Sequence, residues 1–488
     1  MSGTELHWLS ATELAAAIQR REVSSREALD HLVARVDRLD GSVHAVVTRD
    51  LDAARTAADV ADAATAAGRS FGPLHGVPMT VKDSFMTAGM RTTSGAPELG
   101  DFVPDHDAAP VAALRAAGAV IYGKTNLPIY AGDMQSYNEL FPTTTNPYDA
   151  SRTPGGSSGG SAAALAAGFT PLELGSDIGG SIRFPAHMSG VMGHKPTYGI
   201  VPAHGQIPGP PGTLSLADLA VAGPMARTVE DLRVGLAVMA GPNRWDAPGW
   251  RLELPAPARG GPGGRVEPSR LRLSLWIDDP ACPVDAEVRE LLEGAGRALA
   301  DAGATVDADA RPAFSLDKVA ATFRGLLNAA NSGGHSRSSI ERFAADDREG
   351  PMGELHRDLG MRHRHWLSLN ERRQQLRLRW EEFFANGWDA LLCPVMPRVA
   401  IEHDHSTPIA SRRVVSGGAE RPYLELLGWS APAGACLLPA TVVPVGLTSA
   451  GLPVGVQIIG PYLGDLTTLA VAEVVSELVG PLPHPPGF

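Results

Sequence analysis

Residues 155–199 restrict the fold and chemistry of this chain more than any other stretch. They are rich in Gly and Ser, poor in charge, and contain two Gly-Gly-Ser turns that end at Ser157 and Ser181. A run so rich in Gly has weak helix and strand propensity, which favours backbone that approaches another group closely. Adjacent hydroxyls with unhindered backbone N–H groups indicate acyl-transfer chemistry. These residues alone do not decide which serine attacks.

Composition limits the classes of partner. The chain has 488 residues, of which 44% are hydrophobic, so we expect a sizeable core. Its net charge of −12 argues against nucleic acid or an anionic membrane surface as the main partner. The N-terminus lacks the pattern of a signal peptide, and no apolar run reaches the ~20 residues of a membrane helix. We therefore expect a cytoplasmic protein without a membrane segment.

Neither a metal nor a cofactor is expected. Three widely spaced cysteines, Cys282, Cys393 and Cys436, form no metal motif and no disulfide framework. The histidines of RHRHW and EHDHS lack zinc-like spacing. Cys393 is interpreted as a small buried apolar side chain rather than a nucleophile.

The N-terminal third predicts helices followed by a short buried strand. Two capping boxes, Ser10–Glu13 and Ser24–Glu27, predict two helices within residues 9–40. An Ala-rich third helix is expected at 51–67, and an apolar run at 77–81 predicts a strand that ends in Lys82. That lysine has two interpretations: a strand-end side chain that reaches water, or a partly buried base with a lowered pKa.

The remaining elements alternate between helix and strand, which predicts an α/β fold. We expect helical residues 316–385 to form an insertion that shapes the substrate site, and the Pro/Gly-rich residues 254–270 to be a linker or surface insertion. The other expected elements are a helix and strand in 107–121, a helix at 162–167, a strand at 172–174, a helix from 182, a strand-helix-strand unit at 271–308, strands within 389–397 and 440–460, and a closing helix at 465–479.

Four kinds of site compete for the Gly-Ser stretch. A P-loop needs Gly-Lys-Ser/Thr, but Ala follows Ser161, and a Rossmann fingerprint fits no better. A nucleophile elbow with Ser157 or Ser158 matches G-x-S-x-G, although turn formers rather than an apolar strand precede it. The fourth kind uses two serines and a neutral lysine, with consecutive N–H groups at 177–181 as the oxyanion hole.

These residues resemble the amidase signature family closely. The resemblance rests on VKD at 81–83, GGSSGGSAAALAAG at 155–168 and GSDIGGSIRFPAHMSGVMGHKPTYG at 175–199, and it extends over nearly the whole chain. It implies Ser181 as nucleophile, Ser157 as a bridging serine held by a cis peptide bond, and Lys82 as base. It also implies supporting roles for Ser158, Asp177 and Arg183.

The oxyanion hole and substrate contacts follow from the same resemblance. It implies that the N–H groups of Ile178, Gly179, Gly180 and Ser181 form the hole. It places the loop at 130–145 beside the pocket, so substrate-binding candidates there are Tyr130, Gln135, Tyr137 and Phe141. One position departs from the family, which carries Leu-Lys-Pro where this chain has His194-Lys195-Pro196. That change affects packing and leaves the triad untouched.

The resemblance also implies fold and activity. We expect a single amidase signature domain over residues 1–488, with a mixed, twisted central sheet flanked by helices on both faces. We expect hydrolysis of carboxylic amide C–N bonds, with aryl amides or carbamates as the first candidates for a small-molecule substrate. One alternative is the glutaminase subunit of a tRNA-dependent amidotransferase, which DIGGSIRF at 177–184 and the helical block at 316–385 disfavour; the other is an elbow-type esterase. The sequence leaves a homodimer open.

Overall fold

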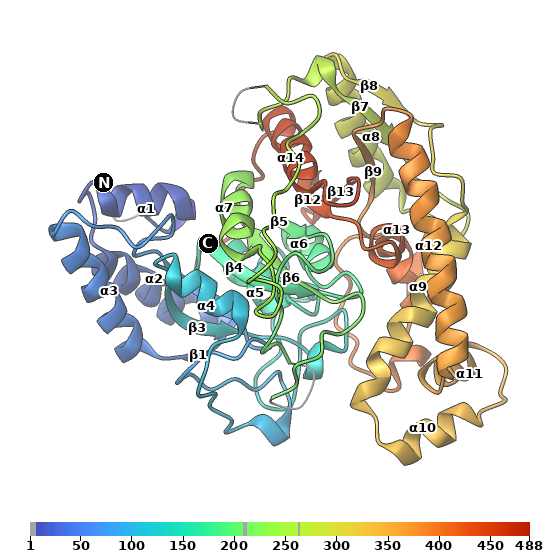
Figure 1. Ribbon diagram of the computed structural model, residues 1–488, viewed down its shortest axis with the longest axis horizontal. Helices are drawn as coiled ribbons and strands as arrows, with labels where there is room; N and C mark the ends of the chain where they lie inside the picture. The colour runs from blue at the N-terminus through green and yellow to red at the C-terminus, as the bar shows by residue number, and fades with distance from the viewer. Residues whose placement is uncertain (1–5, 208–211, 262–263) are drawn as a thin grey trace.

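A computed structural model of the protein describes residues 6–207, 212–261 and 264–488 (Figure 1). Both predicted capping boxes are present at the starts of α1 (Ala11–Gln19) and α2 (Ser25–Leu39). Ser10 N–H donates to Glu13 at 2.8 Å, and Glu13 N–H donates back to Ser10 Oγ at 3.1 Å. Each box satisfies N–H groups that the first helical turn leaves unpaired.

Most of the sequence-predicted helices are confirmed within a few residues. The remaining α-helices are α3 (Leu51–Ala66), α4 (Ala109–Ala116), α5 (Gly159–Ala166), α6 (Arg183–Ser189), α7 (Val229–Met239), α8 (Ala286–Asp301), α9 (Leu316–Asn331), α10 (Arg337–Ala344), α11 (Pro351–Leu359), α12 (His363–Ala385), α13 (Ala431–Ala435) and α14 (Asp465–Val479). The predicted helical block at 316–385 corresponds to α9–α12, which lie together along one side of the molecule in Figure 1.

The centre is a large mixed sheet with the strand order β1-β3-β2-β4-β6-β5-β12-β13-β9-β7-β8. Its strands are β1 (Val46–Arg49), β2 (Pro78–Lys82), β3 (Val120–Thr125), β4 (Leu172–Asp177), β5 (Met192–Lys195), β6 (Val221–Ala226), β7 (Arg272–Leu275), β8 (Thr305–Asp307), β9 (Ala390–Pro394), β12 (Ala440–Leu447) and β13 (Pro453–Ile459). Strand β2 pairs in parallel with β3 and β4, whereas β12 pairs antiparallel with β5 and β13. A separate hairpin joins β10 (Arg413–Ser416) and β11 (Ala419–Pro422).

Helices cover both faces of this sheet, as the strand β12 demonstrates. Consecutive strand residues point to opposite faces. Thr441 donates a hydrogen bond to Thr468 of α14 at 2.9 Å, whereas Val442 packs in one apolar cluster with Ala186 of α6. Helices α14 and α6 therefore lie on opposite faces, which confirms the predicted architecture.

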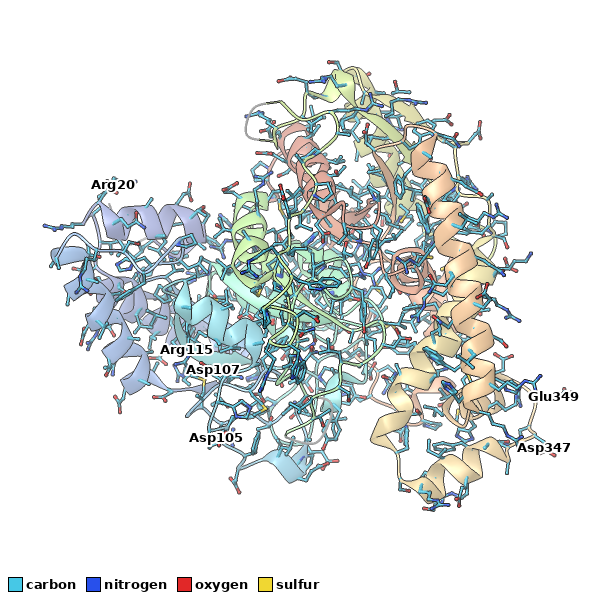
Figure 2. The ribbon with its side chains drawn as sticks, viewed as in Figure 1. Arg20, Asp105, Asp107, Arg115, Asp347 and Glu349 are labelled. Atoms are coloured by element: carbon cyan, nitrogen blue, oxygen red, sulfur yellow. The ribbon has the colours of Figure 1, made fainter. Side chains whose placement is uncertain are left out.

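Many charged side chains lie at the rim of the molecule, although the strands also carry buried ones such as Lys82 and Asp177. Figure 2 shows Asp347 and Glu349, in the segment between α10 and α11, projecting outward from the body. It also shows Arg115 beside Asp107 at α4, where Arg115 Nε lies 3.3 Å from an Asp107 carboxylate oxygen. In the part of the chain that the structure describes, no helix combines the length and apolar character needed to cross a membrane.

One departure from the predicted strands matters for chemistry. The strand predicted at 172–174 extends through Asp177, so the Asp177 carboxylate stands at the carboxyl end of β4. The residues that follow leave the sheet in a turn and enter α6 at Arg183. The second Gly-Gly-Ser turn is thus fixed between a buried strand and a buried helix.

Candidate active site

The first serine loop, residues 153–158, is held by close backbone contact. A Cβ on Gly156 would lie only 2.5 Å from the backbone nitrogen of Gln135, so no larger residue fits there. The peptide bond between Gly156 and Ser157 is cis. Ser158 N–H donates to the Ser181 carbonyl at 3.1 Å, which joins the two serine segments directly. The glycines are therefore needed because two stretches of backbone touch.

Lys82 meets this loop from the end of β2. Its Nζ donates to Ser157 Oγ at 2.7 Å, to Ser176 Oγ at 2.9 Å and to Ser158 Oγ at 3.0 Å. The side chain is fully buried, so the structure excludes the interpretation of Lys82 as a lysine that reaches water. Three hydroxyls surround the amine.

Burial also changes the proton affinity of Lys82. Removal from water lowers the pKa of Lys82 to about 7, and the nearby Asp177 carboxylate opposes this by favouring the charged form. A lysine with this pKa is neutral in an appreciable fraction of molecules near neutral pH. It then has a lone pair that accepts a proton from a hydroxyl.

The second serine turn is organised by Asp177. Its carboxylate accepts N–H groups of Gly180 at 2.9 Å and Ile182 at 3.2 Å, and it makes two 2.9 Å bonds with the guanidinium of Arg183. Burial alone raises the pKa of Asp177, but the pairing with Arg183 and these hydrogen bonds outweigh it, so the pKa is lowered. Asp177 is therefore an ionised buried brace for the turn.

The hydrogen bond of Gly180 bears on the predicted oxyanion hole, which stays a prediction. All four N–H groups from Ile178 to Ser181 are expected from the sequence to face a substrate oxygen. The N–H of Gly180 is instead donated to Asp177, because Gly180 adopts φ +130° and turns this group toward the strand end. Within the described residues, the N–H groups of Ile178, Gly179 and Ser181 make no hydrogen bond, which leaves them as the candidate donors.

Arg183 ties the turn to distant parts of the chain. Its guanidinium donates to the Ser430 carbonyl at 3.0 Å and to Gln457 Oε1 at 2.7 Å. Ser430 Oγ in turn donates to the Gly179 carbonyl at 2.7 Å. These contacts fix the backbone around Ser181 from the side of β13.

The hydroxyl of Ser181 has no partner within the described residues. The residue is buried, with an exposed fraction of 8%, and its hydroxyl makes no hydrogen bond there. Its carbonyl, by contrast, accepts the Ser158 N–H. The hydroxyl is thus positioned by its backbone.

The four predicted substrate contacts already have partners in the protein. Gln135 is buried and donates to the Asp404 carbonyl at 2.7 Å. Tyr137 donates to Asp133 at 2.9 Å and stacks on His405. Tyr130 bonds Glu98, and Phe141 packs under Arg91. The structure thus gives these side chains a role in holding the 130–141 loop, and their predicted substrate contacts stay a prediction.

The elbow alternative and a nucleophilic role for Cys393 find no support in the geometry. Residues 153–158 form loop and bends, so the elbow alternative lacks the strand that Ser157 or Ser158 requires. Among the described residues, no group of three or more His, Cys, Asp or Glu could hold a metal ion. Cys393 is buried beside Gln457, and burial raises the pKa of its thiol to about 12.

The departure at His194 is compensated within the core. His194 Nδ1 lies 2.9 Å from Thr441 Oγ1, and Nε2 lies 3.1 Å from the Asp465 carboxylate at the start of α14. Asp465 also accepts from Thr197. The polar ring is therefore accommodated by partners on β12 and α14 rather than by the site.

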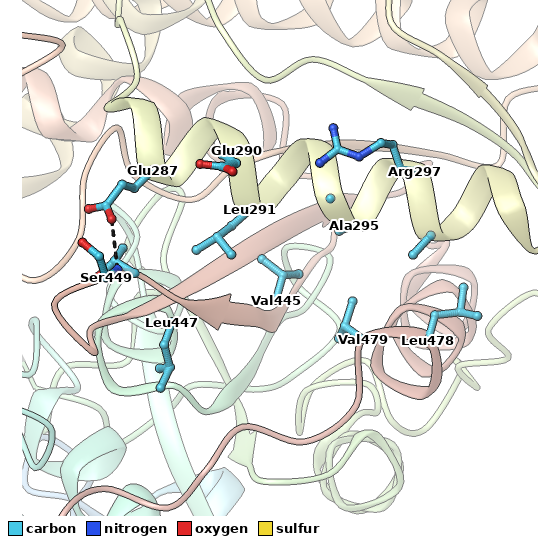
Figure 3. Close-up of a pocket in the computed structure, with 13 residues that line it drawn as sticks. Glu287, Glu290, Leu291, Ala295, Arg297, Val445, Leu447, Ser449, Leu478 and Val479 are labelled. Carbon is cyan, nitrogen blue, oxygen red and sulfur yellow. Dashed lines mark hydrogen bonds between the residues drawn. The ribbon is translucent and has the colours of Figure 1, made fainter.

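A cavity of about 510 Å³ lies elsewhere, between α8, β12 and the end of α14 (Figure 3). Glu287, Arg297, Val445 and Leu478 are among the residues that line it, and Glu287 accepts the Ser449 N–H at 2.9 Å. No predicted site residue lines this cavity.

Sequence reasoning missed several residues of the site. Ser176, which accepts a hydrogen bond from Lys82, lies in the signature at 175–199. Its position next to Asp177 at the end of β4 is the sequence signal that could have identified it. Ser430 and Gln457 come from segments with no local pattern that points to the turn.

Taken together, a buried lysine, two serines and a turn with free N–H groups define a site built for acyl transfer. A sequence profile of the Amidase family matches residues 27–469. The chain therefore belongs to the amidase family, whose members act on carbon–nitrogen bonds.

Its relatives include amidotransferase subunits. The chain is 33% identical to the A subunit of the glutamyl-tRNA(Gln) amidotransferase of Moorella thermoacetica, over 97% of each protein. It is 35% identical to the corresponding protein of Acidothermus cellulolyticus, over 93% of this chain and 91% of the relative.

Solved structures resemble it closely in shape. A bacterial aryl acylamidase of the amidase signature family has a TM-score of 0.80 at 25% identity, with 97% of this chain and 96% of that chain covered. A 6-aminohexanoate cyclic dimer hydrolase gives 0.77 at 27%, covering 97% of each. The amidotransferase A subunit from Thermotoga maritima gives 0.73 at 25%, covering 99% of this chain and 97% of that chain.

Proposed function

We propose that this protein hydrolyses carboxylic amide C–N bonds through an acyl-enzyme on Ser181. The observation that carries the proposal is the 2.7 Å contact between Lys82 Nζ and Ser157 Oγ in a fully buried environment. A neutral lysine there accepts a proton from Ser157 while Ser157 accepts one from Ser181. No histidine or metal is required for this relay.

The steps balance without a co-reactant. Ser181 Oγ bonds to the amide carbon, and its proton passes through Ser157 to Lys82. The N–H groups of Ile178, Gly179 and Ser181 stabilise the resulting oxyanion. The C–N bond then breaks as the proton returns along the same path to the leaving amine. Water next attacks the acyl carbon and passes a proton through Ser157 to Lys82, and this proton returns to Ser181 Oγ as the carboxylic acid leaves.

The test is covalent labelling of Ser181. A fluorophosphonate probe should add one phosphonyl group to the wild type, detected by intact-protein mass spectrometry, and none to Ser181→Ala. The matched control is Ser151→Ala, an exposed serine of the preceding loop, which should label normally. Labelling that persists in Ser181→Ala and is lost in Ser158→Ala would instead support the elbow-type esterase.

Aryl amides or carbamates are the proposed substrate class. The resemblance in shape to an aryl acylamidase supports this choice, at 25% identity over nearly the whole chain. A panel of p-nitroanilides, simple aliphatic amides, glutamine and a carbamate ester, read for released amine, tests it. Faster release from an aliphatic amide than from every aryl substrate would contradict it.

A second candidate is the glutaminase subunit of a tRNA-dependent amidotransferase. Its support is the identity of 33–35% to amidotransferase A subunits over nearly the full length. The same acyl-enzyme chemistry would then release ammonia from glutamine to a partner protein. The two candidates differ in the group attached to the scissile carbonyl and in the need for a partner.

A further inference from the structure

Two leucines from distant parts of the chain converge on the turn that precedes Ser181. A Cβ placed on Gly179 would lie 3.6 Å from Leu427 Cδ2 and 3.7 Å from Leu327 Cδ2, which is ordinary van der Waals distance. Leu327 comes from α9 and Leu427 from the 3-10 helix η9 (Tyr423–Ser430). We call Leu327 and Leu427 the leucine wall.

The leucine wall stands next to the free donors of the turn. Gly179 is itself one of the three residues whose N–H groups are unpaired among the described residues. Leu427 is half-buried, as is Ile178, and both pack at the edge of the main core. Leu327 has an exposed fraction of 7%. The space beside the candidate oxyanion hole is therefore bordered by branched aliphatic side chains.

Charges near the wall are already paired. The Asp177 and Arg183 side chains, both fully buried, bind each other. On α9, the Arg324 guanidinium pairs with Glu354 of α11 at 3.2 Å. On η9, the Glu425 carboxylate pairs with Arg421 at 3.2 Å. None of these groups is left unpaired to receive the ammonium or carboxylate of an amino acid, whose burial without a partner is costly.

The wall lies on the acyl side of the reaction. The leaving amine receives its proton from Ser157, so it must face the relay of Ser157 and Lys82. The leucine wall instead lies beside Gly179, where an added Cβ would reach both leucines at van der Waals distance, at the turn proposed to bind the carbonyl oxygen. A carbonyl carbon attached to Ser181 then directs its remaining substituent away from the relay and toward the wall.

We infer that Leu327 and Leu427 determine acyl-group specificity. They select amides with an uncharged, apolar acyl group over the acyl group of glutamine, which carries both an ammonium and a carboxylate. The inference rests on the proposed function, because it takes Ser181 as the acylated residue. It also gives the helical block at 316–385 a role in the substrate site, through α9.

The experiment compares p-nitroanilides that share one leaving group. The acyl groups are acetyl, butyryl and hexanoyl, together with γ-glutamyl. In the wild type, kcat/KM should rise by up to about fourfold per added methylene that reaches the wall. The γ-glutamyl anilide should be the poorest substrate, since the charged groups named above are paired with each other and do not receive its two charges.

Substitutions of Leu327 and Leu427 should raise KM mainly for anilides with long acyl groups. Leu427→Asp should lower kcat/KM for both anilides, because a carboxylate beside the N–H donors opposes the oxyanion, and the loss should be about tenfold larger for the hexanoyl anilide, which also loses its apolar contact. Leu327→Ala should shift the preferred acyl length upward, and it keeps the test valid if Leu427→Asp folds poorly. The matched control is Leu367→Asp on α12, an exposed leucine away from the turn, which should leave both substrates unchanged.

The outcomes separate this inference from the proposed function. Equal kcat/KM for all acyl groups, or a preference for γ-glutamyl anilide, overturns the role of the leucine wall while the acyl-enzyme stands. Absence of fluorophosphonate labelling at Ser181 overturns the proposed function itself. If Leu427→Asp lowers kcat/KM equally for the acetyl and hexanoyl anilides, Leu427 supports the turn and does not contact the acyl group.

Discussion

At the scale of single residues, the hydrogen-bond partners of Lys82 separate it from Lys195, whereas Lys124 also donates to two hydroxyls, those of Thr87 and Thr92. Lys82, Lys124 and Lys195 are buried, and burial lowers their pKa values to about 7, 8 and 7, whereas Lys318 is exposed. Lys195 Nζ donates only to the carbonyls of Pro196 and Leu438. Carbonyls accept protons in hydrogen bonds but cannot supply one, whereas hydroxyls do both. Lys82, surrounded by three serine hydroxyls, is suited to proton exchange.

The pH dependence of turnover follows from this pKa. A base works in its neutral form, and the neutral fraction of Lys82 rises with pH through about 7. The kcat/KM for an anilide should therefore rise as pH increases from about 5 and level off above about 8. Lys82→Met should lower activity by ~10²–10⁴ at the plateau and remove this ascending limb.

Lys318→Met is the control for that measurement, because it removes the exposed lysine of α9 and should keep both the rate and the pH profile. A rate that stays flat between about pH 5 and 9 in the wild type would contradict a lysine base. Retention of the ascending limb in Lys82→Met would assign it to another group.

At the scale of elements, the site depends on how β4 passes into α6. Asp177 ends the strand, Arg183 begins the helix, and the two side chains close the turn between them. Gly180 completes it at φ +130°, where a Cβ would collide with the ring of Phe184. The backbone around Ser181 is thus fixed by contacts within the protein.

Arg183→Met should therefore cost both stability and turnover. It leaves the Asp177 carboxylate buried without its cation, which typically costs about 3–5 kcal/mol in the free energy of unfolding. The kcat should fall with it, since the N–H donors of the turn lose their brace. Urea denaturation and anilide hydrolysis measure the two effects.

Arg379→Ala is the matched control on α12. Its pair with Glu382 is about half exposed, so its loss should cost at most about 1 kcal/mol and leave kcat unchanged. A similar cost for Arg183→Met and Arg379→Ala would show that the buried pair does not brace the turn.

The elements also show what the sequence can predict and what it cannot. The helices α1 and α2 follow from capping boxes, each of which is contained in four consecutive residues. Strands β5 and β6 escape prediction because Met192–Lys195 carries a histidine and a lysine, and Val221–Ala226 contains a Gly-Pro pair that is uncommon inside strands. The signature identifies Lys82, Ser157 and Ser181. It cannot identify Leu327, Leu427 or Ser430, which reach the turn only through tertiary packing.

At the scale of the whole molecule, sequence and shape point to different relatives. Identity is 33–35% to amidotransferase A subunits, yet the TM-score is 0.80 for an aryl acylamidase and 0.73 for the amidotransferase protein from Thermotoga maritima. All are similar to this chain over at least 91% of its length or theirs, so the overall fold does not discriminate. Discrimination has to come from the surface that meets the acyl group and from the need for a partner.

The last prediction concerns that need. If the acyl pocket is apolar and complete in one chain, the purified protein alone should hydrolyse an anilide or carbamate ester, with kcat/KM far above that for glutamine. Light scattering after size exclusion reports whether the active species is a monomer or the homodimer that the sequence leaves open. An amidotransferase component would behave in the opposite way: glutamine would be its best substrate, and release of ammonia would rise strongly only with a co-purifying partner. Because both cases use Ser181, the labelling experiment gives the same result in each, and the ratio of anilide to glutamine turnover in the isolated chain distinguishes them.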